Sequence, residues 1–309
     1  MARFPRLLFP ALLAAAAFAQ TPTVRSPYSG LVYDPPSRSL RTIAGFWGAA
    51  YLGPARVADI DAASVAPDGR FALIAREETI RLVRSLDRAE PEEIPLAGLS
   101  APWAHVLWNS AEVWIVTSAG LSRVQALDSG PVAGPPLALP SPPAALALQD
   151  GKLLLALADG VYQLTDAGAL SRVFSLEQPC ALAASPRRIF AASCARPRLV
   201  AAADAAGAPE DLPVPESAET LALAGAAFSA GGEMLFLAEA SASRILVFDF
   251  AAGLWRDSLP VEASPERLEA LAGAAYLLRA PARRGEPVLI LDTAAAPPAV
   301  WFVPAGDLP

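Results

Sequence analysis

The chain has 309 residues, of which 54% are hydrophobic and 18% are charged, with 31 Pro and 20 Gly. This composition excludes an intrinsically disordered chain and supplies enough apolar surface for a sizeable core. The formal net charge of −7 argues against nucleic acid as a partner, because phosphate binding needs a basic surface.

Residues 1–19 have the pattern of a secretory signal peptide. Two arginines precede an apolar run from Leu7 to Phe18, and an Ala-Phe-Ala cleavage site stands before Gln20. The run is too short to cross a bilayer as a stable helix, and no later stretch is apolar for 18 residues. We therefore expect a secreted or periplasmic protein without a membrane span, with residues 20–27 as a flexible lead.

Residues 30–43 are expected to form a hairpin that turns just after Asp34. An aromatic segment, residues 46–52, follows the hairpin and lies outside the repeats described below. Its Trp47 and Tyr51 are candidates for contact with a ligand or partner, because the segment could cover a central channel or form an adhesive patch. The alternative is a closure segment that packs between the first and last repeats.

Seven aspartates, each closing a short apolar run, recur along the chain. They are Asp34, Asp87, Asp128, Asp166, Asp204, Asp249 and Asp292, at intervals of 53, 41, 38, 38, 45 and 43 residues. An interval near 40 residues is typical of repeats built from four-stranded units. Each carboxylate can accept hydrogen bonds from the N–H groups just beyond it and so start a tight turn.

Six longer units follow the N-terminal hairpin. They cover residues 57–98, 99–140, 141–177, 178–217, 218–263 and 264–304. Each unit fits a hairpin, a third strand ending at Asp and a short fourth strand. The hairpin turns are marked by Asp68-Gly69, Asp150-Gly151 and Gly231-Gly232, because Gly accepts a positive φ without strain.

This pattern predicts an all-β fold, a single β-propeller of four-stranded antiparallel blades over residues 28–304, with residues 305–309 as a tail. Seven blades are slightly favoured over six. The N-terminal hairpin could complete a short seventh blade, or it could lie outside six full ones.

The turn Ala66-Pro67-Asp68-Gly69-Arg70 resembles the Ser-Pro-Asp-Gly-Arg turn of the WD40-like, TolB-type and YVTN-type propeller repeats of exported bacterial proteins. Weaker versions of the turn and the recurring Asp extend the resemblance over about residues 28–304. The Gly-His and Trp-Asp pairs of true WD40 repeats and the YVTN tetrad are missing from the sequence. The resemblance implies a propeller and assigns no subfamily.

The two cysteines, Cys180 and Cys194, flank a predicted hairpin that turns near Arg187. This register places them opposite each other, and an even number of cysteines in an exported protein favours a disulfide. A loop of this length would stabilise the fold by about 3 kcal/mol on the chain-entropy model. The alternative is two buried free thiols.

Three further residues are candidates for ligand or partner contact. His105 is the only histidine, but no Gly-x-Ser-x-Gly elbow accompanies it, which favours a structural role. Asp59 and Asp61 alternate at the start of a predicted innermost strand, where they could face the channel and hold Ca²⁺ or act as an acid–base pair. With a single Asn in the chain the calcium cluster fits poorly, and we predict no catalytic residue, no metal site and no cofactor.

The sequence therefore favours a non-catalytic binding or scaffold module that takes an unknown protein or small ligand at a propeller face. One alternative is a hydrolase or lyase that uses Asp59, Asp61 and His105 in the channel. It is weakened by the Ala- and Leu-rich inner strands of the other units. A second alternative is a subunit of a secretion or cell-surface assembly, to which the aromatic segment would contribute.

Overall fold

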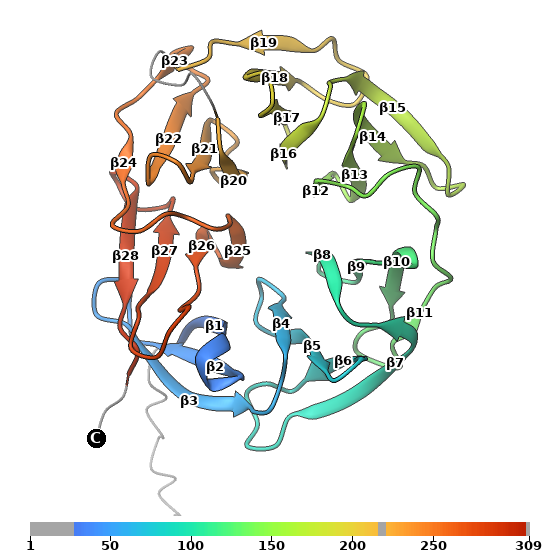
Figure 1. Ribbon diagram of the computed structural model, residues 1–309, viewed down its shortest axis with the longest axis vertical. Helices are drawn as coiled ribbons and strands as arrows, with labels where there is room; N and C mark the ends of the chain where they lie inside the picture. Colours follow the sequence, from blue (N-terminus) through green and yellow to red (C-terminus); the bar gives the residue numbers. More distant parts are fainter. Residues whose placement is uncertain (1–27, 216–220, 307–309) are drawn as a thin grey trace, which may run out of the picture.

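The computed structural model describes residues 28–215 and 221–306. Seven antiparallel sheets form a closed ring, so the predicted β-propeller is confirmed and has seven blades (Figure 1). The predicted signal peptide, the whole of the predicted lead and the last residues of the predicted tail lie outside the described residues. Within the described ranges, no helix is long and apolar enough to cross a membrane.

Blades 1 to 7 follow one another along the chain. Blade 1 contains β1 (Tyr28–Asp34), β2 (Ser39–Ala44) and β3 (Tyr51–Val57); blade 2 contains β4 (Ala62–Val65), β5 (Phe71–Arg76), β6 (Thr79–Arg84) and β7 (Glu92–Ser100); and blade 3 contains β8 (Trp103–Trp108), β9 (Val113–Thr117), β10 (Gly120–Gln125) and β11 (Val132–Ala133). Blade 4 contains β12 (Ala145–Gln149), β13 (Lys152–Leu157), β14 (Gly160–Leu164) and β15 (Leu170–Ser175), and blade 5 contains β16 (Pro179–Ser185), β17 (Arg188–Ser193), β18 (Arg198–Ala202) and β19 (Glu210–Leu212). Blade 6 contains β20 (Leu223–Phe228), β21 (Met234–Glu239), β22 (Arg244–Asp249), β23 (Leu254–Trp255) and β24 (Leu259–Pro260), and blade 7 contains β25 (Glu269–Ala272), β26 (Ala275–Arg279), β27 (Val288–Asp292) and β28 (Ala299–Val303).

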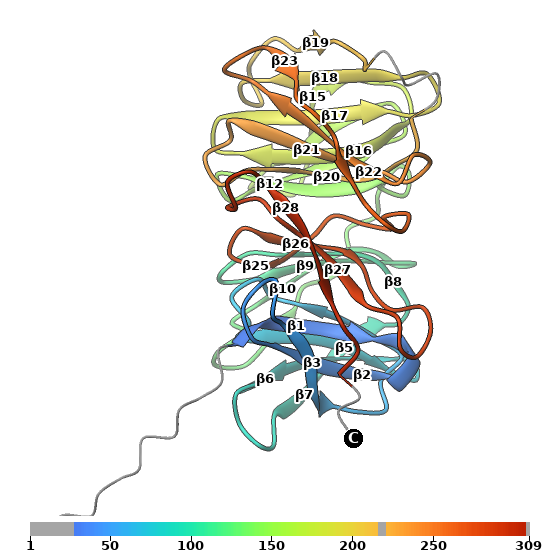
Figure 2. The same ribbon diagram turned by 90° about the vertical axis from the view of Figure 1, so that its left-hand side faces the viewer.

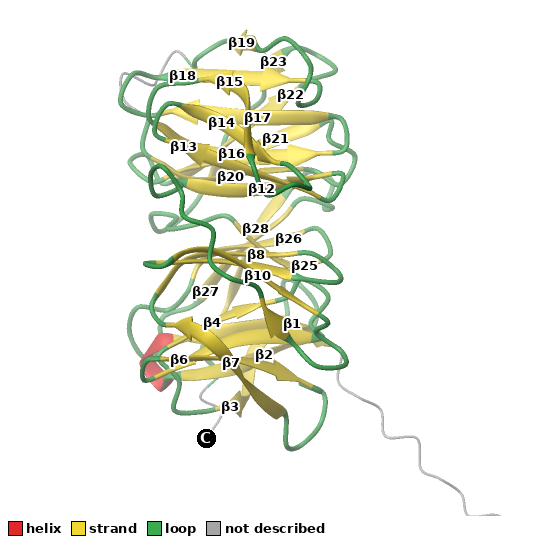
Figure 3. Ribbon diagram, turned by 90° about the vertical axis from the view of Figure 1, so that its right-hand side faces the viewer, coloured by secondary structure: helices red, strands yellow, loops and turns green. Residues whose placement is uncertain are grey.

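The first strand of each blade lies at the inside of the ring and the later strands follow outward (Figure 1). The second strands, such as β9 and β13, are buried on both faces because a neighbouring blade covers each face. Their sequences, VWIVT and KLLLAL, are accordingly runs of apolar residues rather than alternating patterns. The apolar core therefore lies between neighbouring blades, as in the clusters shared by blades 2 and 3 and by blades 4 and 5. Figures 2 and 3 show the stacked sheets edge-on.

The predicted hairpin turns are present where the Gly residues mark them. Asp150 and Gly151 have φ angles of 50° and 77°, which is the left-handed pair that a two-residue hairpin loop requires. At the Asp68-Gly69 turn between β4 and β5, the amide of Gly69 donates to the carbonyl of Ala66 at 2.8 Å. Local turn chemistry therefore sets the register of the hairpins.

Blade 1 consists of the N-terminal hairpin and the strand that follows it. The aromatic segment leads into β3, and Trp47 packs against the apolar cluster between blades 1 and 7, to which Leu271 and Val288 belong. The amide of Leu52 in β3 donates to the carbonyl of Pro304 at 3.1 Å, just beyond β28. Contacts between the two ends of the chain thus close the ring (Figure 2).

The recurring aspartates do not all have the same place in a blade. Six of them end or follow a third strand, whereas Asp34 ends β1, the innermost strand of blade 1. This position explains the long first interval of 53 residues. The predicted turn role is confirmed at Asp204, Asp249 and Asp292, whose Oδ1 atoms accept from amides two residues later at 2.8, 2.9 and 3.0 Å.

Cys180 and Cys194 form the predicted disulfide, with a Cα–Cα distance of 5.8 Å. Cys180 occupies a bulge near the start of β16, and Cys194 directly follows β17. The β16–β17 hairpin turns between Ser185 and Arg188, as expected from the sequence.

Candidate functional site

The central channel contains a cavity of about 520 Å³. Six blades line it through their innermost strands, which are β4, β8, β12, β16, β20 and β25, and through residues just before those strands. Blade 1 contributes none of the described lining residues. The cavity is therefore asymmetric. Strands β4 and β25 come close to each other on the channel side of β1 (Figure 1).

Many of the residues that line the channel are Ala or Gly. The Ala and Gly residues among them are Ala63, Ala104, Ala144, Ala145, Ala181, Ala224, Gly225, Ala226 and Ala270. Gly225 is required by close packing of blades 6 and 7, because an added Cβ would lie 2.9 Å from the backbone N of Leu268. The short side chains of the Ala residues leave room for a ligand, and the wall as a whole exposes polar as well as apolar surface.

The polar groups gather on one side of the channel. Ser64 in β4 donates to Oε1 of Glu269 in β25 at 3.2 Å and accepts from Nε1 of Trp108 at 3.0 Å. The single hydroxyl proton is thus directed at the carboxylate. Arg267 lies beside Glu269, with Nη1 at 3.5 Å from Oε2. This set, Ser64, Trp108, Arg267 and Glu269, is called the polar wall below.

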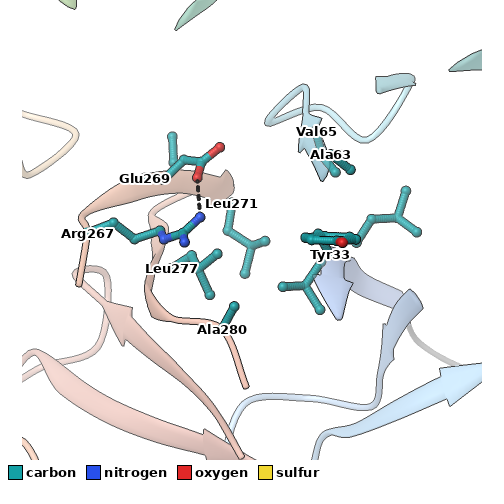
Figure 4. Close-up of a pocket in the computed structure, with 11 residues that line it drawn as sticks. Tyr33, Ala63, Val65, Arg267, Glu269, Leu271, Leu277 and Ala280 are labelled. Atoms are coloured by element: carbon teal, nitrogen blue, oxygen red, sulfur yellow. Dashed lines mark hydrogen bonds and ion pairs between the residues drawn. The ribbon is translucent and has the colours of Figure 1, made fainter. Parts of the chain in front are cut away.

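A small side pocket of about 30 Å³ lies behind Arg267 and Glu269, which also line the channel (Figure 4). Apolar residues such as Leu271 and Leu277 form much of its surface, and the Tyr33 ring lies across from them. The Tyr33 hydroxyl is used elsewhere, because it donates to the Asp61 carbonyl at 2.8 Å. Cavity space therefore lies on both sides of the Arg267–Glu269 pair, with the channel on one side and the side pocket on the other.

His105 in β8 is half-buried and lines the channel. Its Nε2 lies 2.9 Å from the Pro143 carbonyl, and since a carbonyl only accepts, we assign the proton of the neutral ring to Nε2. Nδ1 is then an acceptor. Burial lowers the pKa of His105 below its ordinary value, although the hydrogen bond to Pro143 opposes the shift. The ring is therefore neutral at pH 7.

We expect His105 to make stability depend on pH. The unfolded chain takes up a proton near pH 6.5 whereas the folded protein does so only at lower pH, so the unfolded state binds more protons in between. The free energy of unfolding should fall as the pH drops from about 6.5 to the folded pKa, and His105→Gln should remove that component. Urea unfolding at a series of pH values, with an NMR titration of the single imidazole, measures both quantities. A folded pKa at or above about 6.5 would contradict the assignment.

Asp59 and Asp61 lie just before β4 and are exposed. Asp61 accepts from Arg38 at 2.5 Å and from the amide of Glu77 at 2.7 Å, so it joins blade 1 to a turn of blade 2. The backbone of Asp59 is in the left-handed region, with a φ of 57°. Neither residue is among those that line the channel.

The two aromatic candidates lie elsewhere. Trp47 is half-buried in the seam between blades 1 and 7, and Tyr51 begins β3 on the outer side of blade 1, with 38% of its surface exposed. The structure therefore does not bring the five sequence candidates together. Of the five, His105 alone lines the channel.

Sequence reasoning missed the polar wall. A signal was present, because residues 264–272, SPERLEALA, carry three charges where the inner strands of blades 4 to 6 have Ala, Leu, Gly and other uncharged residues. Comparing the units position by position for an interrupting charge would have pointed to Glu266, Arg267 and Glu269. Within the described residues, no group of three or more His, Cys, Asp or Glu side chains is placed to hold a metal ion.

Solved structures with a similar fold include a protein from Lactobacillus plantarum, with a TM-score of 0.67, 15% identity and coverage of 90% of this chain and 96% of that one. Virginiamycin B lyase from Staphylococcus aureus has a TM-score of 0.55 at 11% identity, covering 86% and 91%. Kuenenia stuttgartiensis hydrazine synthase has a TM-score of 0.55 at 12% identity, covering 93% and 99%.

Identities this low carry information about the fold alone. No protein-family model matches the sequence, and no curated protein matches it either. The comparisons thus support the β-propeller fold and assign the chain to none of the WD40-like, TolB-type or YVTN-type subfamilies.

Proposed function

We propose that this chain is an exported β-propeller that binds a small ligand in its central channel without converting it. The observation that carries the proposal is the cavity of about 520 Å³, whose wall combines many Ala and Leu side chains with polar groups, among them Arg267 and Glu269 on one side. This size and this mixture of surfaces are typical of small-molecule sites. The apolar wall would hold the body of the ligand, and the polar wall would orient it.

Export rests on the signal pattern of residues 1–19 and is supported by the Cys180–Cys194 disulfide, since such bonds persist in oxidising compartments. We expect the mature protein to begin at Gln20. N-terminal sequencing of the protein recovered from the periplasm or medium measures this directly. Recovery of the unprocessed chain from the cytoplasm would contradict export.

The hydrogen bonds in the channel favour binding over catalysis. His105 uses Nε2 on the Pro143 carbonyl, and the Ser64 hydroxyl directs its proton to Glu269. The Ser64 oxygen, which would have to attack, also accepts from Nε1 of Trp108 at 3.0 Å, and this hydrogen bond makes it a weaker nucleophile. These groups supply orientation and hydrogen bonds to a ligand.

Filling the channel should abolish binding. Ala104 is exposed to the channel, so Ala104→Trp fills it without changing the core between blades, and Ala252→Trp on an outer turn is the matched control. A small-molecule library screened by thermal shift should yield compounds that stabilise the wild type and Ala252→Trp but lose the effect at least tenfold with Ala104→Trp. Compounds that stabilise Ala104→Trp equally well would contradict a channel site.

The same compounds test turnover. Mass spectrometry after prolonged incubation, together with glycoside, ester and lactone substrates, should show no product. A product that forms with the wild type and disappears in His105→Ala at unchanged melting temperature would favour the hydrolase or lyase alternative.

The assembly alternative has one observation in its favour. Phe46, in the loop between β2 and β3, is 71% exposed, and Tyr51 begins β3 beside it in sequence. The surface area of two exposed aromatic side chains is small compared with the area buried in a stable protein–protein interface. We therefore place the ligand site in the channel.

A further inference from the structure

The polar wall is electrically balanced. Arg267 and Glu269 lie side by side at 3.5 Å, and the third lining charge, Glu266, lies 3.5 Å from Arg279. His105 is neutral at pH 7, because burial lowers its pKa. Charges cancel in pairs, so the channel presents no excess of either sign to a ligand.

The Arg267–Glu269 pair retains much of its hydrogen-bonding capacity. A distance of 3.5 Å is at the limit for a hydrogen bond, and the two side chains are 44% and 37% exposed. A carboxylate accepts about four hydrogen bonds, and Glu269 uses Oε1 for Ser64 and Oε2 for this long contact. The guanidinium of Arg267 has about five N–H donors and contacts only Glu269 among the described side chains.

A free acceptor and a free donor therefore lie next to each other at the edge of the channel cavity. The group that matches them carries a donor and an acceptor on neighbouring atoms. A carboxamide does so without a charge, because its carbonyl can accept from Arg267 while its N–H donates to Glu269. A zwitterion also matches in sign, but it must lose the hydration of two charges to enter the channel, whereas an amide loses less.

We propose that the channel ligand is a small, uncharged molecule that carries a primary or cyclic amide on an aliphatic body. The amide bridges Arg267 and Glu269, and the aliphatic body lies against the Ala and Leu wall. The side pocket of about 30 Å³ behind the pair lets both side chains adjust to the bound group. This inference rests on the proposed channel function and names its ligand class.

The test uses probes that share one hydrocarbon ring and differ in the polar group. Cyclohexanecarboxamide supplies the amide, cyclohexanecarboxylate the anion, cyclohexylmethylamine the cation and 1-aminocyclohexanecarboxylic acid the zwitterion. Ligand-observed NMR and calorimetry measure their affinities for the wild-type protein. We expect the amide to bind at least tenfold more tightly than each of the other three, and Ala104→Trp to abolish its binding.

Removing one charge of the pair should change the preference in a predictable direction. Arg267→Gln leaves Glu269 unbalanced and should favour the amine probe, whereas Glu269→Gln should favour the carboxylate probe. Arg283→Gln and Glu262→Gln remove the same charges from exposed positions outside the channel lining and should leave the order of affinities unchanged.

These experiments distinguish a failure of the amide assignment from a failure of the proposed channel function. If the library yields channel ligands but none of the four probes binds, or if an ionic probe equals the amide, the amide assignment is wrong and the channel function stands. An unchanged order of affinities in Arg267→Gln and Glu269→Gln also overturns the assignment. If every binder tolerates Ala104→Trp, the channel function itself fails.

Discussion

The double variant Cys180→Ala/Cys194→Ala is expected to lose about 3 kcal/mol of unfolding free energy. The disulfide closes a loop with a sequence separation of 14 and joins the ends of the β16–β17 hairpin. Removing it restores conformational entropy to the unfolded chain, while the strand pairing of the folded hairpin remains. The loss is large because a domain has only about 5–15 kcal/mol of stability in total.

Urea unfolding followed by far-ultraviolet circular dichroism measures this loss. The wild type with a reductant that opens the bond should approach the stability of the double variant, and the same reductant should leave the double variant unchanged. A difference below about 1 kcal/mol would show that the bond contributes little to the stability of the folded ring.

Asp34→Ala is expected to cost about 3 kcal/mol or more, because it leaves a buried arginine without its counterion. The Asp34 and Arg41 side chains are only 7% and 14% exposed, and they form an ion pair at 3.2 Å. Arg41 also donates to the carbonyls of Gly53 at 2.8 Å and Leu52 at 3.1 Å, so it holds β2 to β3. Loss of the carboxylate should therefore weaken blade 1, where the ring closes.

Asp204→Ala is the matched control for this prediction. It removes another of the recurring aspartates, but this one is exposed and accepts one turn amide at 2.8 Å. Its replacement should cost about 1 kcal/mol or less. Equal losses for the two variants would contradict the special role of Asp34, and they would place it with the other turn residues.

The seven aspartates predicted the correct number of blades, although they do not all occupy the same position in a blade. Seven aspartates suggested seven blades, and seven blades are present. However, Asp34 ends an innermost strand and the other six end or follow third strands. The N-terminal hairpin completes a blade only because β3 pairs with β2. The aromatic segment, residues 46–52, leads into β3, and for this segment the sequence left open a patch or channel cover on one hand and a closure segment on the other.

The sequence by itself determined the features that depend on neighbouring residues. Hairpin turns follow from Asp-Gly pairs, because positive φ is a property of the residue itself. The approximate pairing of Cys180 with Cys194 follows from the position of the hairpin turn, and the bulge at Cys180 brings the two residues opposite each other. The repeat length near 40 residues then indicates the class of fold.

Only the tertiary structure decided which polar groups meet. Ser64 and Glu269 are 205 positions apart, and they come within 3.2 Å because the closed ring brings β4 next to β25. Neither residue has a local signal for this contact, whereas Asp59 and Asp61 had the alternating pattern and yet lie outside the channel lining. Strand alternation predicts which residues share a face of a sheet, and the curvature of the ring decides what that face meets.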